Sequence, residues 1–163
     1  MTEPVAVSSM DELKTLTAAN KYVVLDFWAE WCPPCKAIAP IYKTLAGKHG
    51  VAGALAFGKV DVEEARDVAQ AFGISAMPSF LFLEDGEPAG VDVGGRAKGP
   101  AVVATDDGKV TLLRGADPRN LMLIAEELGK LARIVGVAEV EPEAEAATET
   151  EAAAEEKAEE KQT

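Results

Sequence analysis

Residues 24–36, VLDFWAEWCPPCK, contain the only two cysteines of a 163-residue chain, Cys32 and Cys35. A disulfide stabilises a fold mainly by closing a long loop in the unfolded chain, and this pair would close almost none. A purely structural role is therefore disfavoured. Two thiols at this spacing can instead exchange between dithiol and disulfide, provided that one of them is held as the reactive thiolate.

The residues around the pair predict a strand followed by a helix. Residues 22–28 are apolar on both alternating faces except for Asp26, as expected of a central strand that is covered on both sides. A long helix is predicted to begin at or just after the pair and to continue towards Lys48. Cys32 would then stand at the helix N-terminus, where free amides and the helix dipole stabilise a thiolate. We therefore predict Cys32 as the nucleophile and Cys35 as the shielded second thiol.

Half of a zinc site is the alternative explanation for two cysteines at this spacing, but a structural zinc ion needs four ligands. The chain has no second cysteine pair and a single histidine. That residue, His49, is expected as a solvated side chain near the far end of the predicted helix. The metal alternative is therefore disfavoured.

Asp26 is the second informative residue, because a carboxylate inside an apolar strand is costly unless it is paired or neutralised. Burial should raise its pKa. Such an acid can pass a proton to or from Cys35 when the disulfide opens and closes. An Asp26 that reaches solvent at a sheet edge is the alternative, and its apolar neighbours disfavour it. Lys59 is a candidate to approach Asp26 across the sheet, although an exposed strand lysine explains it equally well.

The rest of the chain alternates predicted helices and strands, which indicates a partly parallel α/β sheet. The first helix has Ser9 or Ser8 as its cap, and the last has Asp117 as its cap and Pro118 at its first position. The predicted elements are a helix that starts at 9, strands at 55–62 and 79–83, a helix at 63–72, and a helix from 118 to about 135.

The net charge of −12 is concentrated at the end of the chain. Residues 138–163 contain ten Glu and two Lys, a balance of −8, which leaves −4 for residues 1–137. A nucleic-acid partner is excluded because no basic surface is indicated. We expect one domain over 1–137 and a disordered Glu/Ala-rich tail over 138–163, with a solubilising appendage favoured over an acidic docking arm.

We expect neither export nor membrane insertion, because residues 1–20 lack the pattern of a signal peptide and no apolar run is long enough to cross a bilayer. A lone C-x-x-C pair is typical of a reducing compartment. We therefore expect a cytoplasmic protein without a membrane partner, and a monomer.

Several further motifs follow the cysteines in a fixed order, and together they resemble the thioredoxin family. The resemblance covers roughly residues 5 to 95 and the final helix. Beyond residues 24–36, the motifs that carry it are Pro40, Lys59-Val60-Asp61, Phe72-Gly73-Ile74 and Met77-Pro78-Ser79-Phe80.

The resemblance implies a central mixed β-sheet flanked by helices, with Cys32 attacking, Cys35 resolving, and Asp26 with Lys59 serving proton transfer. It implies no cofactor other than the Cys32–Cys35 disulfide. It also implies a cis bond before Pro78, in a loop whose backbone pairs with the substrate chain. The substrate-binding residues that it implies are Trp31, Pro34, Met77, Pro78 and a groove-lining glycine.

Pro33 departs from the family pattern, in which glycine follows the first cysteine. The resulting Pro-Pro pair is similar to that of tryparedoxins and nucleoredoxins. Because proline lacks an amide that could face the sulfur, we expect a slightly less stabilised Cys32 thiolate and a slightly more reducing disulfide than in a Pro33→Gly variant.

A glycine-rich stretch before the last helix is the second departure. Residues 101–105 and 109–113, separated by Asp106-Asp107-Gly108, predict an additional β-hairpin within about 95–114. A tolerated insertion is the default interpretation; extension of the sheet edge and partner binding are the alternatives. The family's last strand then has two candidates, 91–94 and 112–115. The first is favoured by its distance from Pro78, which predicts Gly94 as the groove-lining glycine.

The function expected from these observations is that of a thiol-disulfide oxidoreductase that reduces disulfide-containing protein substrates and is recharged by a thioredoxin reductase or an equivalent reductant. A tryparedoxin-like electron carrier to a peroxidase is the first alternative. A non-catalytic thioredoxin-fold binding module is the second, and the presence of Asp26, Trp31 and Pro78 argues against it.

Overall fold

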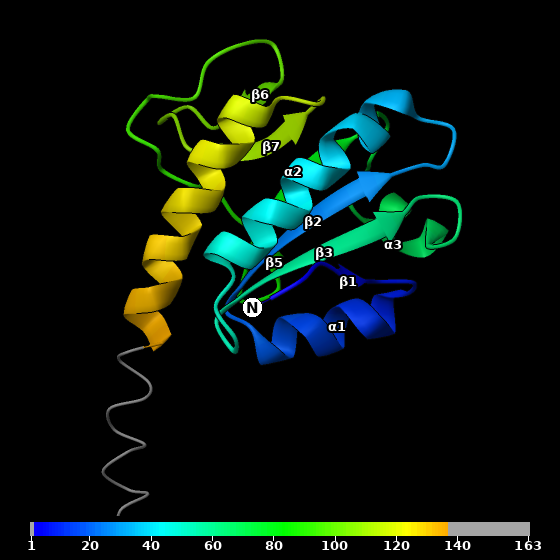
Figure 1. The fold of residues 1–163 in the computed structure, drawn as a ribbon, viewed down its shortest axis with the longest axis horizontal. Helices are drawn as coiled ribbons and strands as arrows, with labels where there is room; N and C mark the ends of the chain where they lie inside the picture. The colour runs from blue at the N-terminus through cyan, green and yellow to red at the C-terminus, as the bar shows by residue number, and fades with distance from the viewer. Residues whose placement is uncertain (1, 137–163) are drawn as a thin grey trace, which may run out of the picture.

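The apolar run 22–28 forms β2 (Tyr22–Trp28), and six of its seven residues are buried. The computed structural model describes residues 2–136 of the chain. The other strands are β1 (Val5–Ala6), β3 (Leu55–Asp61), β4 (Ser79–Glu84), β5 (Glu87–Pro88), β6 (Val102–Ala104) and β7 (Val110–Arg114). The helices are α1 (Met10–Ala19), α2 (Pro33–His49), α3 (Arg66–Ala71) and one over residues 118–136, here called the C-terminal helix (Figure 1).

The strands form one mixed sheet with β2 near its centre. Within residues 2–136 the strand order is β1-β3-β2-β4-β7-β6, and β5 pairs with β4 at one end. β3 is parallel to both β1 and β2, while the β2–β4, β4–β7 and β7–β6 pairs are antiparallel. The expected mixed α/β sheet flanked by helices is confirmed.

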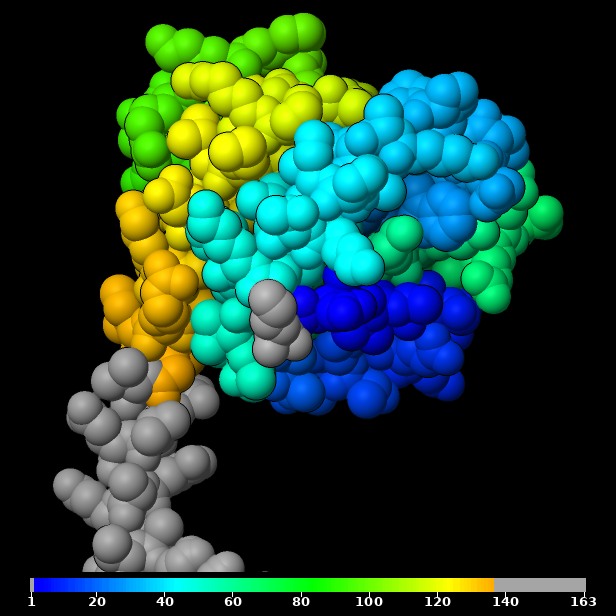
Figure 2. Space-filling view, in the orientation of Figure 1, coloured from blue at the N-terminus to red at the C-terminus, as the bar shows by residue number. Residues whose placement is uncertain are grey.

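Each face of the sheet is covered by its own pair of helices. One core contains Tyr42 of α2 and Leu121 and Ile124 of the C-terminal helix, packed against side chains from β2, β3, β4 and β7. The other contains Leu13 of α1 and Val68 of α3. α2 and the C-terminal helix lie side by side on the face that Figure 2 shows. Because β2 carries apolar side chains on both faces, it holds α2 and the cysteines at a fixed position above the sheet.

Local signals explain most of the element boundaries. Ser9 caps α1, because its hydroxyl accepts a hydrogen bond from the Glu12 amide, and Asp117 accepts one from the Asn120 amide at the start of the C-terminal helix. α3 begins later than predicted. The Asp61 carboxylate accepts hydrogen bonds from the amides of Glu63 and Glu64, and this local turn delays the helix until Arg66.

β4 lies between β2 and β7, so β7 occupies the place that was predicted for residues 91–94. The preference for residues 91–94 as the last strand is therefore wrong. Ser79 and Phe80 of β4 pair with Arg114 and Leu113 of β7. Val91 makes only an isolated bridge with Val110, yet Val91 and Val93 are buried, which accounts for the apolar pattern of that segment without a strand. The predicted hairpin exists as β6 and β7. It is not wholly additional, because β7 is an inner strand and only β6 lies at the edge.

His49 is buried, and the expectation of a solvated side chain is wrong. It lies in the last turn of α2, and 9% of its surface is exposed. A Cβ atom placed on Gly129 of the C-terminal helix would lie 3.2 Å from the His49 Cβ and Nδ1 atoms. Burial, followed by the charge of Lys48, lowers the pKa of His49. The two helices can approach this closely because position 129 has no side chain.

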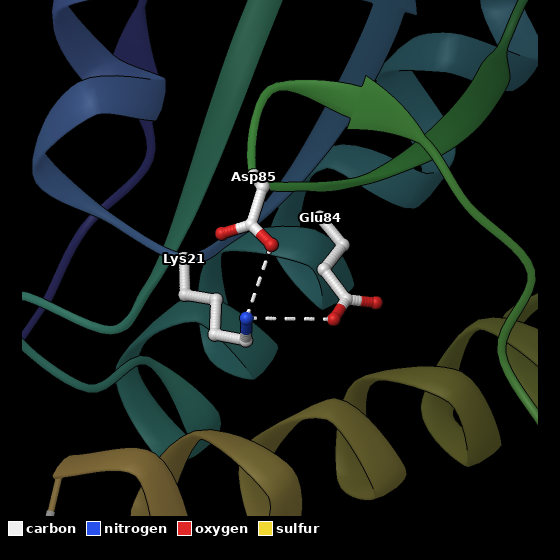
Figure 3. Close-up of polar contacts among 3 residues, drawn as sticks. All are labelled: Lys21, Glu84 and Asp85. Atoms are coloured by element: carbon white, nitrogen blue, oxygen red, sulfur yellow. Dashed lines mark hydrogen bonds and ion pairs between the residues drawn. The ribbon is translucent and has the colours of Figure 1, made fainter.

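Lys21 connects the start of β2 to the turn between β4 and β5, at the end of the sheet opposite the cysteines. Its Nζ atom lies 3.1 Å from an Asp85 oxygen and 3.5 Å from a Glu84 oxygen (Figure 3). Exposed ion pairs of this kind contribute little to stability, and this one serves chiefly to fix the turn.

Two predictions concern membrane insertion and the end of the chain. In the described part of the chain, no helix is both long and apolar enough to cross a membrane. The predicted acidic tail over 138–163 lies outside the described residues.

Candidate active site

Cys32 and Cys35 form a disulfide at the start of α2, with their Cα atoms 5.3 Å apart. Cys32 is the N-cap of the helix, and Cys35 lies in its first turn. The Cys35 amide donates a hydrogen bond to the Cys32 sulfur at 3.2 Å. The predicted position of Cys32 at the helix N-terminus is therefore confirmed, and one backbone donor already faces its sulfur.

The two prolines reduce the number of donors around that sulfur. Pro33 and Pro34 occupy the first two positions of α2, and both are exposed. Neither has a backbone N–H, so the first amide of the helix belongs to Cys35. Stabilisation of a Cys32 thiolate in the reduced protein therefore depends on that amide and on the helix dipole.

The oxidised pair is covered on all sides. Cys32 is 4% exposed and Cys35 is 3% exposed, so the expected difference in shielding between them is not present in the disulfide form. Both cysteines pack with Ala29, and Trp28 and Met77 contact the same cluster. A substrate that reacts with the pair must therefore approach through the side chains around it.

Asp26 is 1% exposed, and its Oδ1 atom has no hydrogen-bond partner among the described residues. Burial raises the pKa of Asp26 to about 7, and the charge of Lys59 opposes this shift. Lys59 is the β3 residue paired with Asp26 of β2, as the sequence suggested. Its ammonium lies 5.0 Å from the centre of the Trp28 ring, a cation–π distance. The site therefore contains an acid that is half-protonated near neutral pH.

Trp31 is the most exposed large side chain beside the disulfide, with 61% of its surface open to solvent. Its indole N–H donates a 2.6 Å hydrogen bond to the Glu63 carboxylate. Sequence reasoning missed Glu63. The only signal was its position just after β3, whose C-terminal end lies beside that of β2.

The Met77–Pro78 peptide bond is cis, as the resemblance implied. Met77 packs against the cysteine cluster, so this bond lies beside the disulfide. The Pro78 carbonyl accepts a 2.8 Å hydrogen bond from the amide of Gly115. We use the name redox face for exposed Trp31 and half-buried Met77 together with Cys32 and Pro78, which are buried beside them.

Gly115, and not Gly94, is the glycine next to the redox face. Gly94 belongs to an exposed turn after the buried segment that ends at Val93, and its amide donates a hydrogen bond to the Asp92 carboxylate, whereas the Gly115 amide donates to the Pro78 carbonyl. Gly115 has φ of 138°, in the region where a side chain is strained. The preference for Gly94 rested on a last strand over residues 91–94, and that strand is absent from the sheet beside β4.

A disulfide in the first turn of a helix that leaves the centre of a mixed sheet is the arrangement of a thiol-disulfide oxidoreductase. A family model described as Thioredoxin matches residues 4–105. A thioredoxin-like protein of Fusarium culmorum is 46% identical over 127 residues, which cover 78% of this chain and 92% of that protein. A thioredoxin of Neurospora crassa is 38% identical over 127 residues, covering 78% and 87%.

Solved structures agree with the sequence relatives. The crystal structure of a thioredoxin of Malassezia sympodialis has 32% identity and a TM-score of 0.58, and the match covers 79% of this chain and 93% of that one. The chain belongs to the thioredoxin family.

Proposed function

We propose that the protein reduces disulfide bonds in other proteins, with Cys32 as the attacking thiol and Cys35 as the resolving thiol. The observation that carries this proposal is the position of Cys32 as the cap of α2, with the Cys35 amide on its sulfur. That environment favours the thiolate, which is the form of cysteine that attacks disulfides.

The reaction passes two electrons from the protein to its substrate. The Cys32 thiolate attacks one sulfur of the substrate disulfide, forms a mixed disulfide and releases the other substrate sulfur as a thiolate. The Cys35 thiolate then attacks the Cys32 sulfur, which releases the second substrate thiolate and leaves the Cys32–Cys35 disulfide. Two protons, lost from the protein's thiols, finish on the substrate's thiols.

Asp26 is proposed to take the proton from Cys35 as it attacks. A carboxyl group with a pKa of about 7 is suited to this step, because both of its protonation states are populated near neutral pH. Lys59 is proposed to keep that pKa from rising further by its positive charge.

The redox face is proposed to bind the client protein, with Trp31, Met77 and Pro78 contacting the segment around its disulfide. Pro34 is exposed beside Cys32 and is included in this surface. Gly115 replaces Gly94 as the glycine of the site. The protein needs no cofactor beyond its own disulfide and acts as a monomer on this proposal.

A reductase of the thioredoxin reductase kind, or an equivalent reductant, must return the pair to the dithiol form. Reduction of client disulfides also requires a reducing compartment, which agrees with the expected cytoplasmic location. The Pro33–Pro34 pair favours one second candidate, a tryparedoxin-like carrier that delivers electrons to a peroxidase.

Reduction of insulin disulfides by the full-length protein, Cys32→Ser and Cys35→Ser tests the proposal. The native protein should precipitate insulin in the presence of a thiol reductant, and both variants should be inactive. Cys35→Ser should also accumulate mixed disulfides with insulin, whereas Cys32→Ser should not. Equal behaviour of all three proteins would remove the catalytic assignment and leave the binding module. Activity with a peroxidase but not with insulin would favour the carrier.

A further inference from the structure

The segment that precedes β6 ends at Ala101, which contacts the two residues, Arg114 and Gly115, that neighbour Ser79 and Pro78. Arg114, the last residue of β7, pairs with Ser79 next to Pro78, and its amide donates a 2.8 Å hydrogen bond to the Ala101 carbonyl. Ala101 also packs close to Gly115, since a Cβ atom on Gly115 would lie 3.8 Å from its Cβ. The end of this segment, at Ala101, therefore lies at the end of the sheet that carries the cysteines.

Asn120 holds this segment in place. Its side chain is 1% exposed, its Nδ2 atom donates to the Lys98 carbonyl at 2.8 Å, and its Oδ1 atom accepts from the Lys98 amide at 3.3 Å. Arg119 adds a 3.4 Å hydrogen bond from its guanidinium to the Arg96 carbonyl. The segment is thus fixed to the first turn of the C-terminal helix by a buried polar side chain.

This arrangement links the segments that carry four exposed cations, namely Arg96, Lys98, Arg114 and Arg119, here called the basic cluster. Among residues 2–136, the ion pairs involve only Lys21 and Lys36, so the basic cluster has no carboxylate partner there. Asp117 is the acid closest to it in the chain, and its carboxylate accepts hydrogen bonds from Asn120.

The other flank of the redox face carries acids. Glu63 accepts from Trp31, and Glu30 pairs with Lys36 at 3.2 Å. Lys36 on that flank is paired with Glu30, whereas the basic cluster on the side of β7 makes no ion pair within residues 2–136. A charged surface next to a reaction site raises the encounter rate of partners with the opposite charge and disfavours others.

We propose that the basic cluster is a docking surface that selects client proteins with Asp or Glu near the disulfide to be reduced. This inference rests on the proposed function, because it assigns a preference among its substrates. A protein segment is favoured over nucleic acid as the occupant, because the cluster borders the redox face and residues 1–137 carry a net charge of −4.

The test compares two synthetic peptides that contain the same intramolecular disulfide, one flanked by three glutamates and one by three glutamines. The reduced full-length protein should reduce the glutamate peptide about tenfold faster at about 0.02 M salt, and the preference should disappear at about 0.5 M salt. A variant with all four residues of the basic cluster changed to Gln should lose the preference but reduce the glutamine peptide at the native rate.

A matched variant controls for total charge. It changes four exposed cations outside the cluster to Gln, namely Lys14, Lys43, Lys109 and Lys130. It should keep the preference for the glutamate peptide, and the unchanged rate for the glutamine peptide shows that each variant is folded.

Several results would overturn the inference. Equal rates for both peptides in the native protein would remove it and leave the proposed function intact, whereas failure to reduce either peptide would remove both. A faster rate for the glutamine peptide in the quadruple variant would indicate that the occupant of the cluster is the chain's own Glu-rich segment, residues 138–163, and not a client protein. Binding of a uridine oligonucleotide that weakens as salt is raised, and that the quadruple variant loses, would assign the cluster to nucleic acid.

Discussion

Asp26 keeps its proton in the folded protein at pH values at which the unfolded chain has lost it. The unfolded group titrates near 3.8, while burial raises the pKa in the fold to about 7. The stability that depends on the neutral form is fully present below pH 4. It is lost as the pH rises from about 4 to about 7, because over that range only the unfolded chain gives up the proton.

Asp26→Asn should therefore stabilise the oxidised protein at alkaline pH. Relative to the native protein, its free energy of unfolding should rise by about 3 kcal/mol between pH 4.5 and pH 8, because asparagine does not ionise. Urea denaturation at the two pH values measures the difference. An offset between the two proteins that is the same at both pH values would show that Asp26 does not have the raised pKa.

Pro33 affects how strongly the Cys32–Cys35 disulfide oxidises other thiols. Pro33→Gly restores an amide at the first position of α2, where it can point towards the Cys32 sulfur. The variant should stabilise the Cys32 thiolate better than the native protein does. Its dithiol form is then more stable relative to its disulfide form, and its disulfide is the stronger oxidant. Equilibration of both proteins with glutathione measures this, and a native disulfide that is clearly more oxidising than that of the variant would contradict it.

At the scale of elements, the C-terminal helix positions a loop through one side chain. Asn120→Ala removes both hydrogen bonds to Lys98 and leaves that buried backbone partly unsatisfied, so it should cost about 2–3 kcal/mol. Amide hydrogen exchange should accelerate at Lys98, whose N–H then loses its partner. Met122→Ala, on an exposed position of the same helix, should change stability by less than about 0.5 kcal/mol. Unchanged exchange at Lys98 in the Asn120 variant would refute the connection.

Elements with strong local signals were predictable from the sequence. β2 has apolar residues on both faces, α1 has its cap at Ser9, and α2 begins with two prolines after a cysteine that can act as a cap. Each of these signals acts over a few residues, so the local chain is enough to determine the structure.

Contacts between distant segments were not predictable in the same way. Residues 91–94 and 112–115 both end apolar runs with a glycine, and only pairing with β4 distinguishes them. The burial of His49 depends on the missing side chain of Gly129, and the acceptor for Trp31 comes from the segment after β3. Periodicity carries no information about such partners.

In the whole molecule, the residues proposed to react lie apart from the apolar cores that stabilise the fold. The disulfide, Trp31 and the cis bond before Pro78 lie at one end of the sheet, while Lys21 fixes the turn at the other. Two apolar cores, one on each face, connect these ends. Substitutions on the redox face are therefore expected to alter reactivity with small effects on folding, whereas Asp26, inside the sheet, affects both.

The margins of the sheet have a further consequence. In the described part of the chain, the outermost strands are β1, with two residues, and β6, with three residues and a register shift between Val103 and Ala104. Such short margins offer another chain few consecutive backbone groups with which to build an intermolecular ladder. Fibrous self-association through the edges of the described sheet is therefore disfavoured.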